Sequence, residues 1–511
     1  MSPPPLVSRL VRPEALTLPL RRTEGLAAIL GLLGLLVSAA GSWRPSYWGD
    51  EAASVMSAER SLPGLFRLLD NVDAVHGAYY LLLHVWIGLF GSSELATRGL
   101  SALFVGVATA GTFVLARTLT SHRVGVLAAI VFALLPRVTY MGAEARSAAV
   151  ATAVVVWLTV LLVHLLRSRY QDRATRFALW AAYTALLALG IYFFLFVLLL
   201  IPVLGLAVLL IPPEGDRWAG IRAWTLATAS GLALAAPVMA ASLQQRDQIA
   251  FIGRRPPIAV LTAAVHQWFG NVPLAVLAWG LILLAVVMVF AVRGRWAAPT
   301  ATRAALAVML AWLIVPSAAL LIGTHLVTPM YSLRYLSVGT PAAAIAIAMG
   351  IACLRPLWPQ AAALGLITAL MLPTYLDQRG EFGKNYGSDL RQASEVVRAG
   401  AQPGDAIVFD ESVRPSRKPR LALRLYPAAF EGLRDVTLAV PFDATNDLWD
   451  VAVPLEQVTD RLTDTNRVWV LQNQASGENR RGDNIRTLQQ LGFTVAESTM
   501  LNRTQIIEMT R

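Results

Sequence analysis

Long apolar segments, separated by short polar and basic stretches, occupy most of residues 25–375. Each approaches the roughly 20 apolar residues that cross a bilayer as a helix, so the pattern predicts eleven membrane-spanning helices. The segments are Gly25–Gly41, Gly99–Ala116, Val124–Tyr140, Ala148–Leu166, Ala178–Phe194, Leu195–Ile211, Ile221–Ala241, Val272–Val292, Ala304–Thr324, Tyr335–Cys353 and Ala361–Tyr375. Of the 511 residues, 56% are apolar and 15% are charged, and the mean hydropathy is +0.55. These values exclude a water-soluble globule and predict an α-helical polytopic membrane protein.

A further apolar stretch, Ala78–Phe90, is too short to span a bilayer, and we expect it in the membrane interface. If it is left out, most basic loops, including the run from Arg167 to Arg176, fall on the cytoplasmic side. This predicts a multi-pass plasma-membrane protein with a cytoplasmic amino-terminal segment, residues 1–24, and an extracytoplasmic carboxyl end. Gly25–Gly41 follows Arg21 and Arg22 as in a signal peptide, but we interpret it as a retained span because candidate chemistry follows it.

The composition changes after Tyr375, where short β-like runs alternate with helical patterns. This alternation predicts a small extracytoplasmic α/β domain at 376–511, next to a membrane domain at 25–375 whose first outer loop is 42–97. The β-like runs are Asp405–Phe409, Val436–Val440, Arg467–Gln472 and Phe493–Thr499, and the helical patterns are Ser388–Ala399, Leu455–Leu462 and Ile485–Leu491.

Acidic residues cluster in the first outer loop, and ionisable groups near a bilayer are candidates for function. The cluster consists of Asp50, Glu51, Glu59, Asp70 and Asp73. Two short amphipathic runs, ending at Arg60 and Asp70, belong in the interface plane. Asp50 is either a catalytic base or the N-cap of a helix that begins at Glu51. Glu51 either binds a hydroxyl group or only occupies the first turn of that helix.

Arginines on the predicted outer side are the second candidate feature, because they oppose the positive-inside tendency. They are Arg137, Arg146, Arg246, Arg254, Arg255 and Arg334. Guanidinium groups bind phosphate well, so Arg334 and Arg146 are candidates for phosphate binding. The alternatives are headgroup contacts or ion pairs, such as one with Glu144. Gln245 and Gln248 are candidates for sugar hydroxyls, or else solvated loop residues.

The first loop resembles that of the GT-C glycosyltransferases, integral membrane enzymes that take a sugar from a polyprenyl-phosphate carrier. The resemblance rests on Trp48-Gly49-Asp50-Glu51 after the first span and on the segment from Asp73 through His76 to Tyr80. Glu144-Ala145-Arg146 and Arg334-Tyr335 match the actinobacterial mannosyltransferase-like members. The common His-Pro-Pro of the family is replaced by His76-Gly77-Ala78.

The resemblance implies that Asp50 is the catalytic base, assisted by Glu51. It further implies that substrates are bound by Asp73, His76, Tyr80, Glu144, Arg146, Arg334 and Tyr335, while Gln245 remains a substrate-binding candidate by its place in an outer loop. One carboxylate suffices to deprotonate an acceptor hydroxyl, and such a single displacement inverts the anomeric carbon.

The expected partners are a polyprenyl-phosphate-sugar donor, a cell-envelope glycan or glycolipid acceptor and the bilayer, without nucleic acid. Mannose is the expected sugar, with arabinofuranose and glucose as rivals. No resident cofactor is expected, although Asp50, Glu51 and His76 could hold a divalent metal. The chain lacks Asp-x-Asp and phosphate-cradling glycine motifs, which disfavours nucleotide-sugar or ATP chemistry. A lipid-linked-sugar flippase or transporter, or a scaffold for partner enzymes, remains an alternative.

Overall fold

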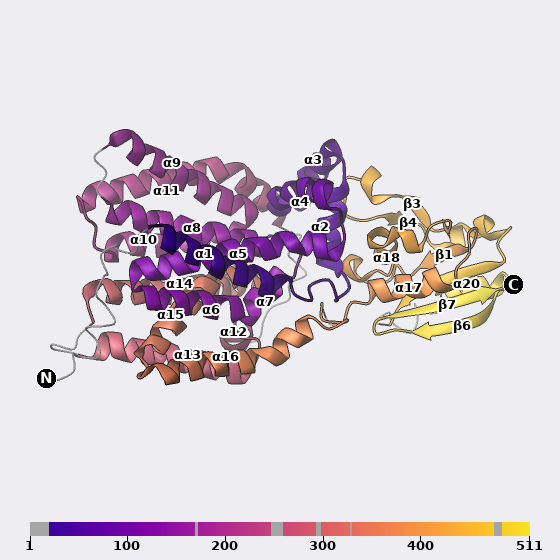
Figure 1. The fold of residues 1–511 in the computed structure, drawn as a ribbon. Helices are drawn as coiled ribbons and strands as arrows, with labels where there is room; N and C mark the ends of the chain where they lie inside the picture. Colours follow the sequence, from indigo (N-terminus) through magenta and orange to yellow (C-terminus); the bar gives the residue numbers. More distant parts are fainter. Residues whose placement is uncertain are drawn as a thin grey trace. The chain divides into compact units, whose positions relative to one another are not determined.

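The computed structural model describes residues 20–168, 172–246, 259–292, 298–327, 330–385, 387–474 and 483–511, without the side chains of 20–22 and 259. Helices dominate up to residue 378 (Figure 1). They are α1 (Leu20–Ala39), α2 (Gly49–Glu59), α3 (Leu62–Asn71), η1 (Ala74–His76), α4 (Gly77–Phe90), α5 (Glu94–Leu119), α6 (His122–Leu134), α7 (Pro136–Gly142), α8 (Ala148–Arg167), α9 (Arg173–Phe193), η2 (Leu195–Leu200), α10 (Ile201–Leu210), α11 (Arg217–Gln244), α12 (Ala259–His266), α13 (Val272–Val286), η4 (Val287–Ala291), α14 (Thr300–Leu326), η6 (Leu333–Gly339), α15 (Thr340–Cys353) and α16 (Leu357–Gln378).

Each of the eleven predicted spans coincides with a helix or a helix pair. Within the described part of the chain, eight helices are long and apolar enough to cross a membrane. A ninth candidate is the pair α6 and α7, bent by 62° before Pro136, while α1 and η2–α10 are shorter apolar helices. Ala74–Phe90 is also among the shorter apolar helices. The structure therefore supports a multi-pass membrane protein, and the number of crossings and the orientation stay predictions.

The chain folds into two compact units that follow packing rather than the linear order of the sequence. The first unit contains the described parts of Met1–Ala40, Ala74–Tyr79 and Arg98–Leu376. The second contains Gly41–Asp73, Tyr80–Thr97 and the described parts of Asp377–Arg511. Most of the first outer loop thus belongs to the same compact unit as the carboxyl-terminal domain. The linear domain division at residue 375 stays a prediction.

In the first unit, α15 is the most enclosed helix and packs against α6, α13 and α14 (Figure 1). Its residues from Thr340 to Ala352 are all buried. Small residues allow this close packing, since a Cβ at Gly350 would lie 2.0 Å from the main-chain oxygen of Leu281. Because η6 leads directly into α15, this rigid helix fixes the position of the segment that carries Arg334 and Tyr335.

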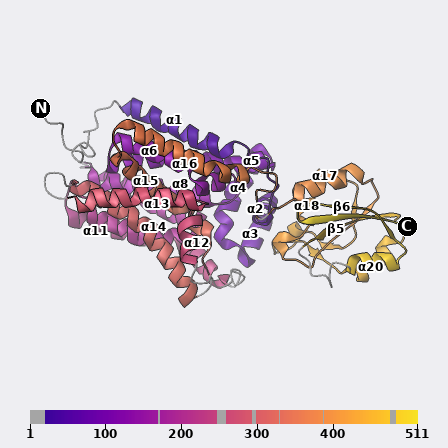
Figure 2. The same ribbon diagram turned by 90° about the horizontal axis from the view of Figure 1, so that it is seen from below.

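In the second unit, a mixed five-stranded sheet has the order β2-β1-β5-β7-β6. Strand β1 runs parallel to both of its neighbours, β2 and β5. Strand β7 runs antiparallel to both of its neighbours, β5 and β6. Helices cover both faces, with α17 on one side and α20 on the other (Figure 2). The carboxyl-terminal elements are α17 (Leu390–Gly400), β1 (Ala406–Phe409), η7 (Pro415–Arg417), α18 (Leu421–Leu425), η8 (Pro427–Ala429), β2 (Arg434–Asp435), β3 (Leu438–Val440), η9 (Phe442–Ala444), β4 (Val451–Ala452), η10 (Leu455–Gln457), η11 (Thr459–Leu462), β5 (Arg467–Asn473), α20 (Asp483–Gln490), β6 (Thr494–Met500) and β7 (Thr504–Thr510).

Two local predictions for this domain need correction. Leu455–Leu462 forms two short 3₁₀ helices instead of one α-helix, because Leu455 and Leu462 enter the core while Val458 breaks the helical backbone. The run Val436–Val440 is not one strand, since β3 pairs with β4 in a separate two-stranded sheet. The α/β class of the domain is confirmed.

Candidate active site

In the second unit, Asp50 and Glu51 lie in the first turn of α2. The helix begins at Gly49, and its N-cap residue, Trp48, makes no side-chain cap bond. The N-cap interpretation of Asp50 is therefore wrong, because the helix starts two residues earlier than that interpretation requires. Asp50 is half-buried and Glu51 is 0% exposed. A helix N-terminus stabilises negative charge, so this turn favours the ionised form of a carboxylate, the form that a general base requires.

Asp73 ends the loop that follows α3, and its backbone has a φ of 58°. This left-handed conformation is unusual for residues other than glycine, although Asp and Asn tolerate it. The Tyr80 hydroxyl, which is fully buried, donates to Asp73 Oδ2 at 2.7 Å. The structure thus brings together these two predicted site residues, and Asp73 stabilises the turn in front of η1.

In the first unit, η1 carries His76 and packs against α11 and α9. Arg146 Nη2 lies 3.1 Å from His76 Nε2, and because a guanidinium only donates, this ring nitrogen is the acceptor. Gln245, at the end of α11, accepts through Oε1 from the Ala74 amide at 2.9 Å. Two predicted site residues therefore meet each other, and a third fixes the backbone of the same short helix.

Arg146 lies in the turn between α7 and α8, which also contains Glu144. The Ser101 hydroxyl on α5 binds the main-chain oxygens of Glu144 and Arg146 at 2.6 and 3.5 Å, and the Arg146 amide donates to the Glu144 oxygen at 2.8 Å. Glu144 is 2% exposed. The buried serine thereby fixes the Glu-Ala-Arg motif, a contact that the sequence alone did not reveal.

Arg334 and Tyr335 lie in the first turn of η6, where the Ser337 hydroxyl donates to the Arg334 main-chain oxygen at 2.7 Å. The Tyr335 ring stacks on Phe196 with centroids 4.6 Å apart. Arg137, named among the outer arginines but not among the site residues, interacts electrostatically with both Arg334 and Glu144. Its Nε donates to the Gln267 main-chain oxygen at 2.9 Å.

The Arg137 guanidinium is therefore exposed to the positive charge of Arg334 and to the negative charge of the buried Glu144 carboxylate. Such a cluster binds an anion more readily than an isolated arginine does. The sequence signal that could have identified Arg137 is its place directly after Pro136 in an otherwise apolar segment.

Within the described ranges of the chain, no group of three His, Cys, Asp or Glu side chains could hold a metal ion. Arg254, Arg255 and Gln248 lie outside the described residues. Arg246 is exposed, two residues after the end of α11.

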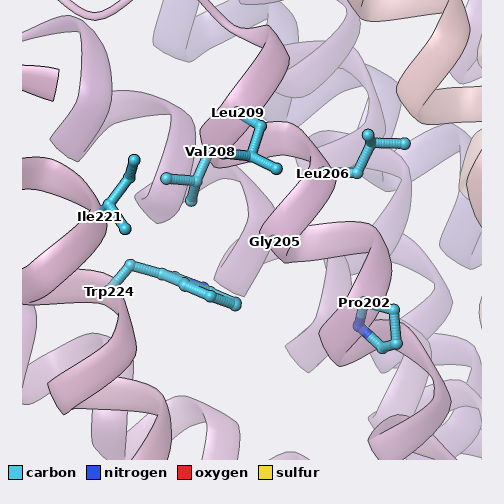
Figure 3. Close-up of a pocket in the computed structure, with 7 residues that line it drawn as sticks. All are labelled: Pro202, Gly205, Leu206, Val208, Leu209, Ile221 and Trp224. Carbon is cyan, nitrogen blue, oxygen red and sulfur yellow. The ribbon is translucent and has the colours of Figure 1, made fainter. Parts of the chain in front are cut away.

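An apolar cavity of about 300 Å³ lies between α10 and α11 (Figure 3). Its lining consists of Pro202, Gly205, Leu206, Val208, Leu209, Ile221 and Trp224. It contains no charged side chain, so it offers nothing that would bind a sugar or a phosphate. The candidate site is therefore formed by the charged and polar residues described above, and not by this cavity.

No protein-family model matches the chain, and no curated protein matches its sequence. Among solved structures, ArnT from Cupriavidus metallidurans in the apo state is similar, with a TM-score of 0.60 and 12% identity over 95% of this chain and 98% of that one. The structure of ArnT bound to undecaprenyl phosphate gives a TM-score of 0.58 and 12% identity over 96% and 98%. The GT-C fold, predicted from the first-loop motifs, is thereby confirmed.

Replacing Asp73 by Ala should lower the free energy of unfolding by about 1–3 kcal/mol, because alanine disfavours positive φ and removes the acceptor for Tyr80. Asp73→Asn is the matched control, since asparagine tolerates this backbone and keeps an acceptor oxygen. Thermal unfolding of the purified protein in detergent measures both variants. Equal losses in the two would contradict the structural role of this turn.

Proposed function

We propose that this protein transfers a monosaccharide from a polyprenyl-phosphate donor to a glycan or glycolipid of the cell envelope, at the outer face of the plasma membrane. Mannose is the proposed sugar. The observation that carries the proposal is a GT-C fold in which the acid after the first span opens a helix. The ArnT structure bound to undecaprenyl phosphate supports a carrier of the same chemical class.

In the proposed reaction, Asp50 accepts the proton of an acceptor hydroxyl as its oxygen attacks the anomeric carbon. The new carbon–oxygen bond forms while the bond from that carbon to the phosphate oxygen breaks. Polyprenyl phosphate leaves with the bonding electrons, and the anomeric centre is inverted. No covalent enzyme intermediate is needed, and Glu51 is proposed to assist from the same helical turn.

The departing phosphate gains negative charge, so cationic groups fixed in advance lower the barrier. Arg334 is the proposed phosphate ligand, with Arg137 as a neighbouring positive charge. Two arginines that repel each other become more stable when an anion lies near both. We propose that substrate binds against η1, in contact with His76, and that Arg146 and Gln245 fix this short helix in place. The ring of Tyr335 is proposed to lie beside the phosphate.

A donor panel tests the function. Purified protein in nanodiscs receives polyprenyl-phosphate mannose, glucose or arabinofuranose with envelope lipid extract as acceptor, and mass spectrometry follows the products. We expect a new mannosyl product and released polyprenyl phosphate. Transfer of another sugar would correct the sugar, whereas movement of intact donor across proteoliposomes without transfer would favour a flippase.

Asp50→Asn should reduce the transfer rate by roughly 10²- to 10⁴-fold, the usual contribution of general-base catalysis. The amide is nearly the same size as the carboxylate but cannot accept the proton. Asp70→Asn is the matched control, because Asp70 is exposed on α3 in the same loop. Near wild-type transfer by Asp50→Asn would refute its role as the base.

Arg334→Gln should weaken binding of polyprenyl phosphate by roughly 10- to 150-fold, the equivalent of one lost charge-assisted hydrogen bond of about 1.5–3 kcal/mol. The dissociation constant of polyprenyl phosphate without a sugar, measured in detergent, reports this effect separately from catalysis. Arg246→Gln, at an exposed outer-side arginine, removes the same charge from a different place. If both variants bind equally well, Arg334 is not the phosphate ligand.

A further inference from the structure

The carboxyl-terminal domain binds the main chain just before the proposed base. Within the second unit, the Tyr47 amide donates to the Tyr426 hydroxyl oxygen at 3.1 Å. The Tyr47 main-chain oxygen accepts from the Ser388 hydroxyl at 2.7 Å. Both polar groups of this peptide segment, three residues before Asp50, are thus bound by side chains from the far end of the sequence.

Tyr426 is held in turn by an ion pair. Its hydroxyl donates to Glu94 Oε1 at 2.7 Å, and Arg391 Nη2 lies 2.6 Å from the same oxygen. Burial, together with the negative charge of Glu94, raises the pKa of Tyr426 above its ordinary value. The phenol therefore stays protonated, so it donates to Glu94 while it accepts from Tyr47.

Arg391 extends this network to the segment that follows the first span. Its Nη2 donates to the main-chain oxygens of Trp43 and Pro45 at 2.9 and 3.0 Å, and its Nη1 donates to the Arg44 oxygen at 3.1 Å. One guanidinium therefore fixes three consecutive peptide groups of residues 43–45. Lysine could not make these contacts, because it lacks the planar fork of donors.

The helix of Asp50 also packs directly into the domain. A Cβ at Gly49 would lie 2.1 Å from the Ser416 main-chain oxygen in η7, so only glycine fits there without moving backbone. Beyond Asp50, Ala52 and Met56 are buried in the same hydrophobic core as Phe409 and Leu471 of the sheet. Contacts with the domain therefore flank Asp50 on both sides in the sequence.

We propose that the carboxyl-terminal domain is a positioning element of the active site, and that Tyr426, held by Glu94 and Arg391, is a positioning residue for Asp50. This inference rests on the proposed function, in which Asp50 is the base. Tyr426 touches neither the reacting atoms nor the carrier in this scheme. It acts by fixing the Tyr47 peptide, and with it the place where α2 begins.

Tyr426→Phe removes only the hydroxyl and should lower kcat for sugar transfer by about 10-fold or more, since a displacement of about 1 Å at a catalytic group can cost 10²-fold. The KM for the donor should change by less than about threefold, because the proposed phosphate ligands remain. Ser388→Ala removes the shorter of two hydroxyl bonds to the Tyr47 main-chain oxygen, the other coming from Ser46 Oγ at 3.1 Å, and should lower kcat in the same direction. The Tyr426→Phe and Ser388→Ala variants are assayed together with the wild type and Asp50→Asn. Binding of polyprenyl phosphate gives the concentration of folded protein in each sample, to which kcat is normalised.

Arg467→Gln is the matched control, since it breaks an ion pair with Glu508 in the same domain without touching residues 43–49. Wild-type kcat in both Tyr426→Phe and Ser388→Ala, with Asp50→Asn inactive, would overturn the positioning role and leave the proposed function intact. An equal loss of kcat in Arg467→Gln would also overturn it, by indicating general destabilisation. If Tyr426→Phe does not fold, Ser388→Ala decides by the same kcat criterion. Activity in Asp50→Asn would instead refute the base.

Discussion

The guanidinium of Arg391 joins parts of the chain that lie about 300 residues apart in sequence. It binds the carboxylate of Glu94 and three carbonyl groups of residues 43–45. A half-buried arginine is stable only when its donors are satisfied, so this one side chain requires the loop and the domain to fold together. The position of the acidic helix α2 follows from that requirement.

Much of the membrane fold could be predicted from the sequence, because apolar length and basic loops are local signals. The predicted break between Phe194 and Leu195 is real: α9 ends at Phe193, and Phe194 is extended. The bend before Pro136 was not predicted, although proline inside an apolar segment is its usual cause. The last strand, β7, was also missed, although it pairs antiparallel with β5 on one side and with β6 on the other.

The candidate site was predictable only in part, for a different reason. Residue types such as Asp50 and Arg334 can be recognised individually, since ionisable groups near a bilayer are rare. Pairings such as His76 with Arg146, or Tyr80 with Asp73, depend on tertiary structure and leave no periodic pattern. α4 begins at Gly77, directly after His76, so η1 continues into a helix while Arg146 and Gln245 bind its first residues.

The carboxyl-terminal domain contains no recognisable catalytic motif, yet the length of α2 gives a physical reason for its presence. An isolated helix of 11 residues is marginal in water, because nucleation is costly and few hydrogen bonds compensate for it. α2 gains its stability from burial of Ala52 and Met56 in the core of the domain. If this helix frayed, its carboxylate would sample many positions. General-base catalysis needs the carboxylate in one position, within hydrogen-bond reach of the proton that it accepts. In the proposed scheme, the domain therefore supplies order to Asp50, the residue that accepts the proton.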